Sequence, residues 1–109
     1  MSYAILDNNR FYAEGLRYAL LRRGVQPEVQ SDTVQWQPAL LTRRVVVVRC
    51  RFSVAGTHQA LINILLRLEA ARWQGSLYLV CNEKGWALAT HLRKRFSTLT
   101  LYIIDDRIA

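Results

Sequence analysis

Four consecutive valines, Val45 to Val48, constrain the fold of this chain more than any other feature of its sequence. β-branched side chains favour extended backbone, and successive side chains of a strand point to opposite faces of a sheet. A strand that is apolar at every position is therefore buried on both faces, which is typical of parallel sheets covered by helices on each side. We expect a strand over residues 44–50 inside such a sheet, and hence an α/β fold.

Apolar segments of two kinds alternate along the rest of the chain. Short apolar runs predict four further strands, over residues 3–7, 25–30, 76–82 and 98–104. Three- and four-residue apolar spacing predicts helices over residues 10–23, 57–73 and 85–96, and a short helix from about Ser31 to Leu41 that is imperfect because it contains Pro38. Five strands alternating with four helices predict a three-layer, flavodoxin-like fold with a five-stranded parallel sheet in the order 2-1-3-4-5. Pro27 then falls in an edge strand, where a missing N–H is tolerated.

Length and composition set the class of protein. A chain of 109 residues with 51% hydrophobic residues forms one domain, residues 1–109, with a core of its own. No apolar run approaches the ~18 residues of a membrane span, and the N-terminus has no signal-peptide pattern. Two cysteines do not make a disulfide framework. We therefore expect a cytoplasmic protein with no membrane association.

Patterns for metal binding, nucleotide binding and catalysis are missing from the sequence. His58 and His91 have no second ligand at metal-binding spacing. There is no phosphate-binding loop, no G-x-G-x-x-G and no readable nucleophile–base pairing. We expect no metal, no cofactor and no enzymatic activity.

The order of elements resembles the receiver domains of response regulators over nearly the whole chain, without their last helix. Residues 5–25 read Ile-Leu-Asp-Asn-Asn-Arg-Phe-Tyr-Ala-Glu-Gly-Leu-Arg-Tyr-Ala-Leu-Leu-Arg-Arg-Gly-Val. This segment is similar to the first strand and helix of atypical receivers in LuxR-type transcription regulators, such as the auxiliary regulators of the Rcs capsule phosphorelay. The resemblance implies a regulatory domain related to two-component signalling.

The same resemblance implies a site where the strands end, and this chain departs from the family pattern there. Receivers have two acids after the first strand, an aspartate after the third, Ser or Thr after the fourth and lysine after the fifth. The corresponding positions here are Asp7 and Asn8, then Arg49 (or Cys50, one residue further), then Cys81, then Asp105. Without the aspartate no acyl phosphate forms, and an arginine beside Asp7 opposes Mg²⁺. We expect a pseudo-receiver that is not phosphorylated.

Two environments are open to Arg49. It either pairs with Asp7, Asp105 or Asp106, in which case Arg49→Ala destabilises the fold, or points to solvent together with Arg51.

The chain ends about five residues after the last predicted strand, which leaves no room for the last helix of the fold. One sheet face is then uncovered, and the amphipathic alternation points to the face with Ser76, Tyr78 and Val80 and with Thr98, Thr100, Tyr102 and Ile104. Tyrosine is enriched at interfaces. The predicted interaction surface comprises Tyr78, Trp86, Arg93, Thr100 and Tyr102. Alternatively, the chain is the N-terminal part of a longer regulator with a DNA-binding domain.

The net charge is +7, and most of the basic residues are arginines. Arg22-Arg23 and Arg93-Lys94-Arg95 end helices, where the helix dipole favours cations. Arg43, Arg44, Arg49 and Arg51 have no such explanation and form a candidate patch for nucleic acid or an acidic partner.

Three hypotheses about function remain open. The first is a receiver-like domain that regulates transcription through protein–protein contact, as a homodimer or as a heterodimer with another regulator. The second is a small basic protein that binds nucleic acid or an acidic partner directly, with strong salt dependence. The third is a small-molecule sensor that uses the crevice where the strands end.

Overall fold

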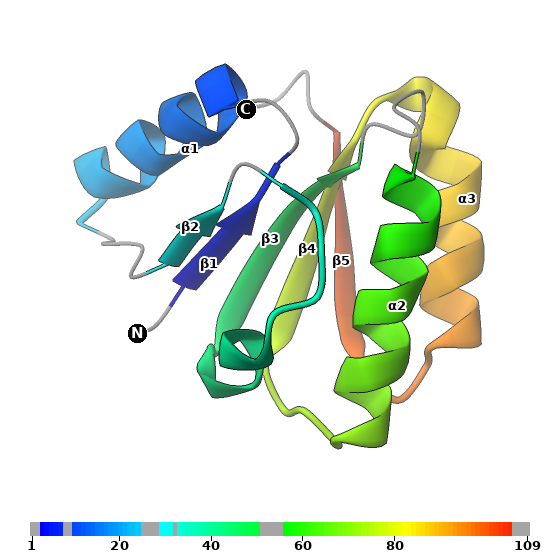
Figure 1. Cartoon of the computed structure of the whole chain (residues 1–109). Helices are drawn as coiled ribbons and strands as arrows, with labels where there is room; N and C mark the ends of the chain where they lie inside the picture. The colour runs from blue at the N-terminus through cyan, green and yellow to red at the C-terminus, as the bar shows by residue number, and fades with distance from the viewer. Residues whose placement is uncertain (1–2, 8–9, 25–28, 32, 51–55, 106–109) are drawn as a thin grey trace.

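One parallel sheet organises the protein. The computed structural model describes residues 3–7, 10–24, 29–31, 33–50 and 56–105. The strands are β1 (Tyr3–Leu6), β2 (Val29–Ser31), β3 (Val45–Cys50), β4 (Ser76–Cys81) and β5 (Thr100–Asp105). They pair in parallel in the order β2-β1-β3-β4-β5, with the valine-rich β3 in the middle (Figure 1). The predicted parallel α/β architecture is confirmed, and it is compatible with a flavodoxin-like fold.

The described part of the edge strand β2 is short, and residues 25–28 of the predicted strand lie outside the described residues. It begins at Val29 and has three residues, whereas β3, β4 and β5 have six each. Pro27 lies outside the described residues. The sheet is therefore carried mainly by β1, β3, β4 and β5, and β2 adds a short parallel pairing to β1.

Three α-helices connect the strands: α1 (Arg10–Arg22), α2 (Thr57–Ala70) and α3 (Glu83–Arg95). Glycine at 24, with φ of 80°, follows the end of α1, as expected of a residue in the left-handed region. The side chain of Asn82 caps α3 by accepting a hydrogen bond from the backbone N–H of Gly85 at 3.1 Å. The predicted α-helix from Ser31 to Leu41 is wrong.

A 3-10 helix, η1 (Pro38–Thr42), occupies part of that segment instead. Proline has no N–H to donate and clashes with the preceding turn, so it is tolerated only in the first turn of a helix. Pro38 accordingly stands at the start of η1, and the helix cannot extend back toward Ser31.

The main hydrophobic core lies on the side of the sheet that α2 and α3 cover (Figure 1). Val46, Val48, Leu77 and Leu79 contribute from β3 and β4, and all are fully buried. They belong to one cluster with the apolar faces of the two helices, made by Leu61, Ile64, Leu65, Leu68, Ala89 and Leu92. Among the described helices, α1 is the one on the other side of the sheet, against β1 and β2.

A second, smaller cluster lies on the α1 side. Val45, Val47 and Val80 form it, with Leu16 of α1, Tyr3, Tyr78 and Ile104 packed against it as partly buried neighbours. Within the described part of the chain, no helix crosses this side of β3, β4 and β5. None of the described helices is both long enough and apolar enough to span a membrane.

Candidate functional site

Nine residues of β3, β4 and β5 share the α1 side of the sheet, and we call them the uncovered face because no described helix lies across them. Val45, Val47 and Val80 are buried there beside Leu16 of α1, and the other six are half-buried or exposed. The strand registers arrange them in three rows: Val45–Ser76–Thr100, Val47–Tyr78–Tyr102 and Arg49–Val80–Ile104. Because side chains alternate along a strand, every second residue belongs to this side and its neighbours belong to the helix-covered core. Each row runs across the three strands from the middle of the sheet to its edge.

Two stacked tyrosines mark the centre of the uncovered face. The rings of Tyr78 and Tyr102 lie 5.0 Å apart at an interplanar angle of 20°. Tyr102 is 47% exposed, whereas Leu101 beside it on β5 is buried. The predicted uncovered side of β4 and β5 is therefore the correct one, because Leu77, Leu79 and Leu101 all point into the helix-covered core.

Arg49 ends the row nearest the carboxyl edge of the sheet and reaches back to α1. Its guanidinium carbon lies 3.4 Å from the centre of the Tyr12 ring. Tyr12 in turn makes an edge-to-face contact with Phe11, with ring centres 6.3 Å apart. A guanidinium stacked on an aromatic face is a cation–π interaction. The half-buried Arg49 does not extend into solvent, and Tyr12 is a partner that the sequence analysis did not identify.

The predicted receiver-like pocket is only partly assembled. Asp7 directly follows β1 and is 1% exposed. Since Leu6 pairs with Val48, Asp7 and Arg49 occupy the next position along two neighbouring strands. Asn8 lies outside the described residues.

Cys81 and Asp105 occupy a different row and the opposite side of the sheet. They pair with each other one residue beyond Val80 and Ile104, so alternation turns them away from Arg49. Cys81 is a buried free thiol in the helix-covered core. The predicted pocket of Asp7, Asn8, Arg49, Cys81 and Asp105 did not take this alternation into account, and Cys81 and Asp105 do not share a side of the sheet with Arg49. Asp106 lies outside the described residues.

The predicted interaction surface also divides between the two sides of the sheet. Tyr78, Thr100 and Tyr102 lie together on the uncovered face. Trp86 and Arg93 are exposed and stand seven residues apart on α3, which covers the opposite side. Tyr78, Thr100 and Tyr102 form one continuous surface. Trp86 and Arg93 lie on the opposite side of the sheet and do not belong to that surface.

The candidate basic patch is not continuous in its described members. Arg43 and Arg44 precede β3, whereas Arg49 is near its carboxyl end. Arg49 stands five positions after Arg44, which corresponds to roughly 17 Å of extended strand at ~3.3 Å per residue. The carbonyl of Arg43 accepts a hydrogen bond from the indole Nε1 of Trp73 at 2.8 Å. Arg51 lies outside the described residues.

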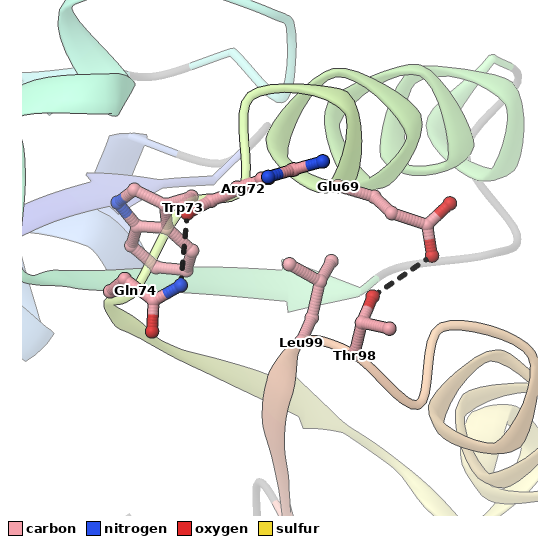
Figure 2. Close-up of a pocket in the computed structure, with 6 residues that line it drawn as sticks. All are labelled: Glu69, Arg72, Trp73, Gln74, Thr98 and Leu99. Atoms are coloured by element: carbon pink, nitrogen blue, oxygen red, sulfur yellow. Dashed lines mark hydrogen bonds between the residues drawn. The ribbon is translucent and has the colours of Figure 1, made fainter.

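A cavity of about 340 Å³ lies elsewhere, between the end of α2 and the start of β5. Figure 2 shows its lining, Glu69, Arg72, Trp73, Gln74, Thr98 and Leu99. The Thr98 hydroxyl donates to the Glu69 carboxylate at 3.2 Å, and the Gln74 amide donates to the Arg72 carbonyl at 3.1 Å. This cavity lies at the amino ends of β4 and β5, whereas ligands of open α/β sheets bind at the carboxyl ends.

The uncovered face offers stacked aromatic rings, apolar side chains and one guanidinium as contact groups. In the described ranges, histidine, cysteine, aspartate and glutamate side chains do not gather in groups of three or more that could hold a metal ion. Comparisons of the chain with protein-family models, curated proteins and solved structures found no match. The functional argument therefore depends on the geometry of the uncovered face.

Proposed function

We propose that this chain is a non-phosphorylatable, receiver-like regulatory domain that acts in transcriptional control by binding another protein, as a homodimer or a heterodimer. The observation that carries the proposal is the uncovered face, with Tyr102 47% exposed and stacked on Tyr78 over an apolar floor. Parallel sheets are normally covered by helices on both sides. A tyrosine-rich, apolar surface with few charges has the composition of an interface core.

The receiver-like part of the proposal is supported by the strand order and by the residues where the strands end. The order β2-β1-β3-β4-β5 is that of flavodoxin-like folds. Arg49 stands beside the buried Asp7. By the resemblance to receivers, Arg49, or Cys50 one residue further, corresponds to their phosphorylated aspartate. A guanidinium offers only N–H donors and has no carboxylate that could form an acyl phosphate, which supports regulation through binding.

Direct binding of nucleic acid is the second candidate, and the net charge of +7 favours it. The positions of the arginines favour it less, because Arg43 and Arg44 are separated from Arg49 by the length of β3. The two candidates differ in how they respond to salt and to a change at Tyr102.

Sedimentation velocity over a series of protein concentrations tests the proposal. We expect a self-association that Tyr102→Asp abolishes and Tyr18→Asp leaves intact. Tyr18 is a matched control because it is 67% exposed on α1, outside the uncovered face. In parallel, anisotropy of labelled duplex DNA is measured at about 50 and 200 mM salt. A monomeric chain that binds DNA strongly at low salt, with or without Tyr102→Asp, would contradict the proposal.

A further inference from the structure

The outer edge of the sheet at β5 is a long strand edge on which no described strand is paired. β5 is the last strand of the order β2-β1-β3-β4-β5, and β4 lies on its inner side. Its six residues, Thr100–Asp105, include one charged residue, the aspartate at the end, and neither lysine nor proline. Natural sheets protect long edges with charges, prolines or bulges, because an open edge pairs readily with another strand. The described part of β2, at the other edge, has three residues and offers a shorter template.

Helix α3 borders this edge with a flank that is turned away from α2. Glu83, Trp86, Thr90 and Arg93 follow one another at three- and four-residue steps, so they share one flank of the helix. Leu88, two positions from both Trp86 and Thr90, lies on the opposite flank and packs against the main core, which α2 shares. Since α2 stands on that side of α3 (Figure 1), the first four residues, which we call the α3 flank, lie on the outer side next to β5.

The α3 flank is complementary to a second copy of itself. A two-fold axis perpendicular to the sheet at the edge of β5 sets two β5 strands antiparallel, and it sets the two α3 helices antiparallel as well. The exposed Glu83 at the start of α3 then faces the exposed Arg93 of the second copy. Trp86 likewise faces Thr90 of the second copy. The two pairs have the same midpoint along the helix, as a single axis requires.

The spacing of strands and helices permits strand pairing and helix packing together. Helix α3 contacts both β4 and β5. A helix that lies over two strands at an edge is two strand spacings, about 10 Å, from its symmetry mate when the edges pair at ~4.8 Å. Packed helices lie about 8–10 Å apart, so the two α3 helices come into contact.

The same axis continues the tyrosine row on the other side of the sheet. Directly opposite residues of antiparallel strands share a face, so Tyr102 meets Tyr102 or Ile104 of the second copy. Tyr102 is 47% exposed and already stacks on Tyr78, and pairing at the edge covers it. The edge of β5 therefore lies between two groups of exposed contact residues, the α3 flank on one side of the sheet and Tyr102 on the other.

We infer that two copies of the chain pair along β5 in antiparallel orientation, so that one continuous sheet runs through both copies and α3 packs on α3. Strand addition supplies main-chain hydrogen bonds, and the α3 flank and the tyrosines supply side-chain contacts. The inference rests on the proposed function and names the surface through which a homodimer forms. Tyr102→Asp weakens an edge-paired dimer and a dimer through the uncovered face alike, so other measurements must distinguish them.

Hydrogen exchange followed by mass spectrometry distinguishes edge pairing from any other dimer contact. Exchange is measured at a dilute concentration, where the chain is monomeric, and at a concentration where sedimentation shows the dimer. About 150 mM salt screens the repulsion between two copies of net charge +7. The outward-pointing amides of β5 should exchange at least about tenfold more slowly in the dimer. The amides of Val29–Ser31, at the other edge, are the control and should not change.

Charge reversal tests the antiparallel orientation. Glu83→Arg and Arg93→Glu should each weaken the dimer about tenfold, because each places like charges together twice in one dimer. The double variant restores opposite charges across the axis and should recover most of the affinity. Positions 83 and 93 are about 15 Å apart within one helix, so this recovery cannot arise within one copy. Arg95→Glu makes the same change of charge on the other flank of α3 and should not weaken the dimer.

Thermal melts at the dilute concentration should be nearly the same for all these variants, because the side chains are exposed in each copy. Slow exchange at β5 without recovery in the double variant would mean that the strands pair in another orientation, which overturns the inference. A dimer sensitive to Tyr102→Asp in which β5 exchanges freely would place the contact on another surface, and the proposed function would stand without the inference. A chain that stays monomeric overturns the inference, and a monomeric chain that binds DNA strongly overturns the proposed function as well.

Discussion

The two sides of the sheet are made by the same strands but differ in what covers them. On the α2 and α3 side, Leu77 and Leu79 are fully buried in a core built from two helices. On the other side, Tyr78 and Tyr102 stack against each other, and Tyr102 remains 47% exposed. Strands β4 and β5 thus separate a helix-covered side from a more exposed side by simple alternation.

Strand β3 does not follow that division. Val45 and Val47 on the uncovered face are only 9% and 8% exposed, although no described helix lies above them. Leu16 and Tyr78 shield them from the side. A strand with valine on both of its faces is typical of a sheet that is covered on both sides. The contrast with β5 shows that exposure on this side of the sheet rises from β3 in the middle to β5 at the edge.

The largest effect should come from the helix-covered side. Leu79→Ala removes a fully buried side chain beneath two helices, and we expect it to cost about 2–5 kcal/mol of unfolding free energy. Urea denaturation measures this loss as a lower midpoint at unchanged slope. Leu66→Ala is the matched control, because Leu66 is 42% exposed on α2, and it should change stability by no more than about 0.5 kcal/mol. Equal effects of both changes would mean that the core is elsewhere.

A second prediction compares neighbouring valines of β3 directly. Val46→Ala and Val47→Ala remove the same atoms from opposite sides of one strand. The transfer of two methyl groups is worth about 1.6 kcal/mol. Val46→Ala should lower the free energy of unfolding by more than this transfer value, because it leaves a cavity under the helices. Val47→Ala should lower it by about this value or less, because the uncovered face can collapse or admit water. If Val47→Ala proves the more costly, the uncovered face is covered in the free protein.

The elements and their order were predictable because they depend on local patterns. The valines of β3, the spacing of α2 and the apolar runs of β4 and β5 each predict their own structure without reference to the rest of the chain. The one failed helix, near Ser31, is a case in which a plausible cap was followed by too few residues before Pro38. The exposed side of β5 was also predictable, since Thr100 and Tyr102 alternate with leucines.

The details of the site depend on contacts between distant residues, and the sequence analysis missed them. Tyr12 and Arg49 lie 37 positions apart in the printed sequence, and only the pairing of β1 with β3 brings α1 near the end of β3. A periodicity argument sees Tyr12 as one apolar residue among several in α1. Likewise, treating the strand ends as one cluster ignored that Cys81 and Asp105 alternate away from Arg49.

The smallest predicted effect concerns the contact that joins α1 to the uncovered face. Arg49→Ala removes the cation from above the Tyr12 ring, and we expect a loss of about 1 kcal/mol, the size of a partly desolvated cation–π interaction. In a domain of this length, that loss lowers the melting temperature by about 4–8 °C. Arg93→Ala, at an exposed position on α3, should leave the melt within about 0.5 kcal/mol of the parent. In the Tyr12→Leu background, Arg49→Ala should cost less than in the parent, because the Arg49–Tyr12 contact is already absent. Full additivity of the two changes would mean that the contact between Arg49 and Tyr12 does not contribute to stability.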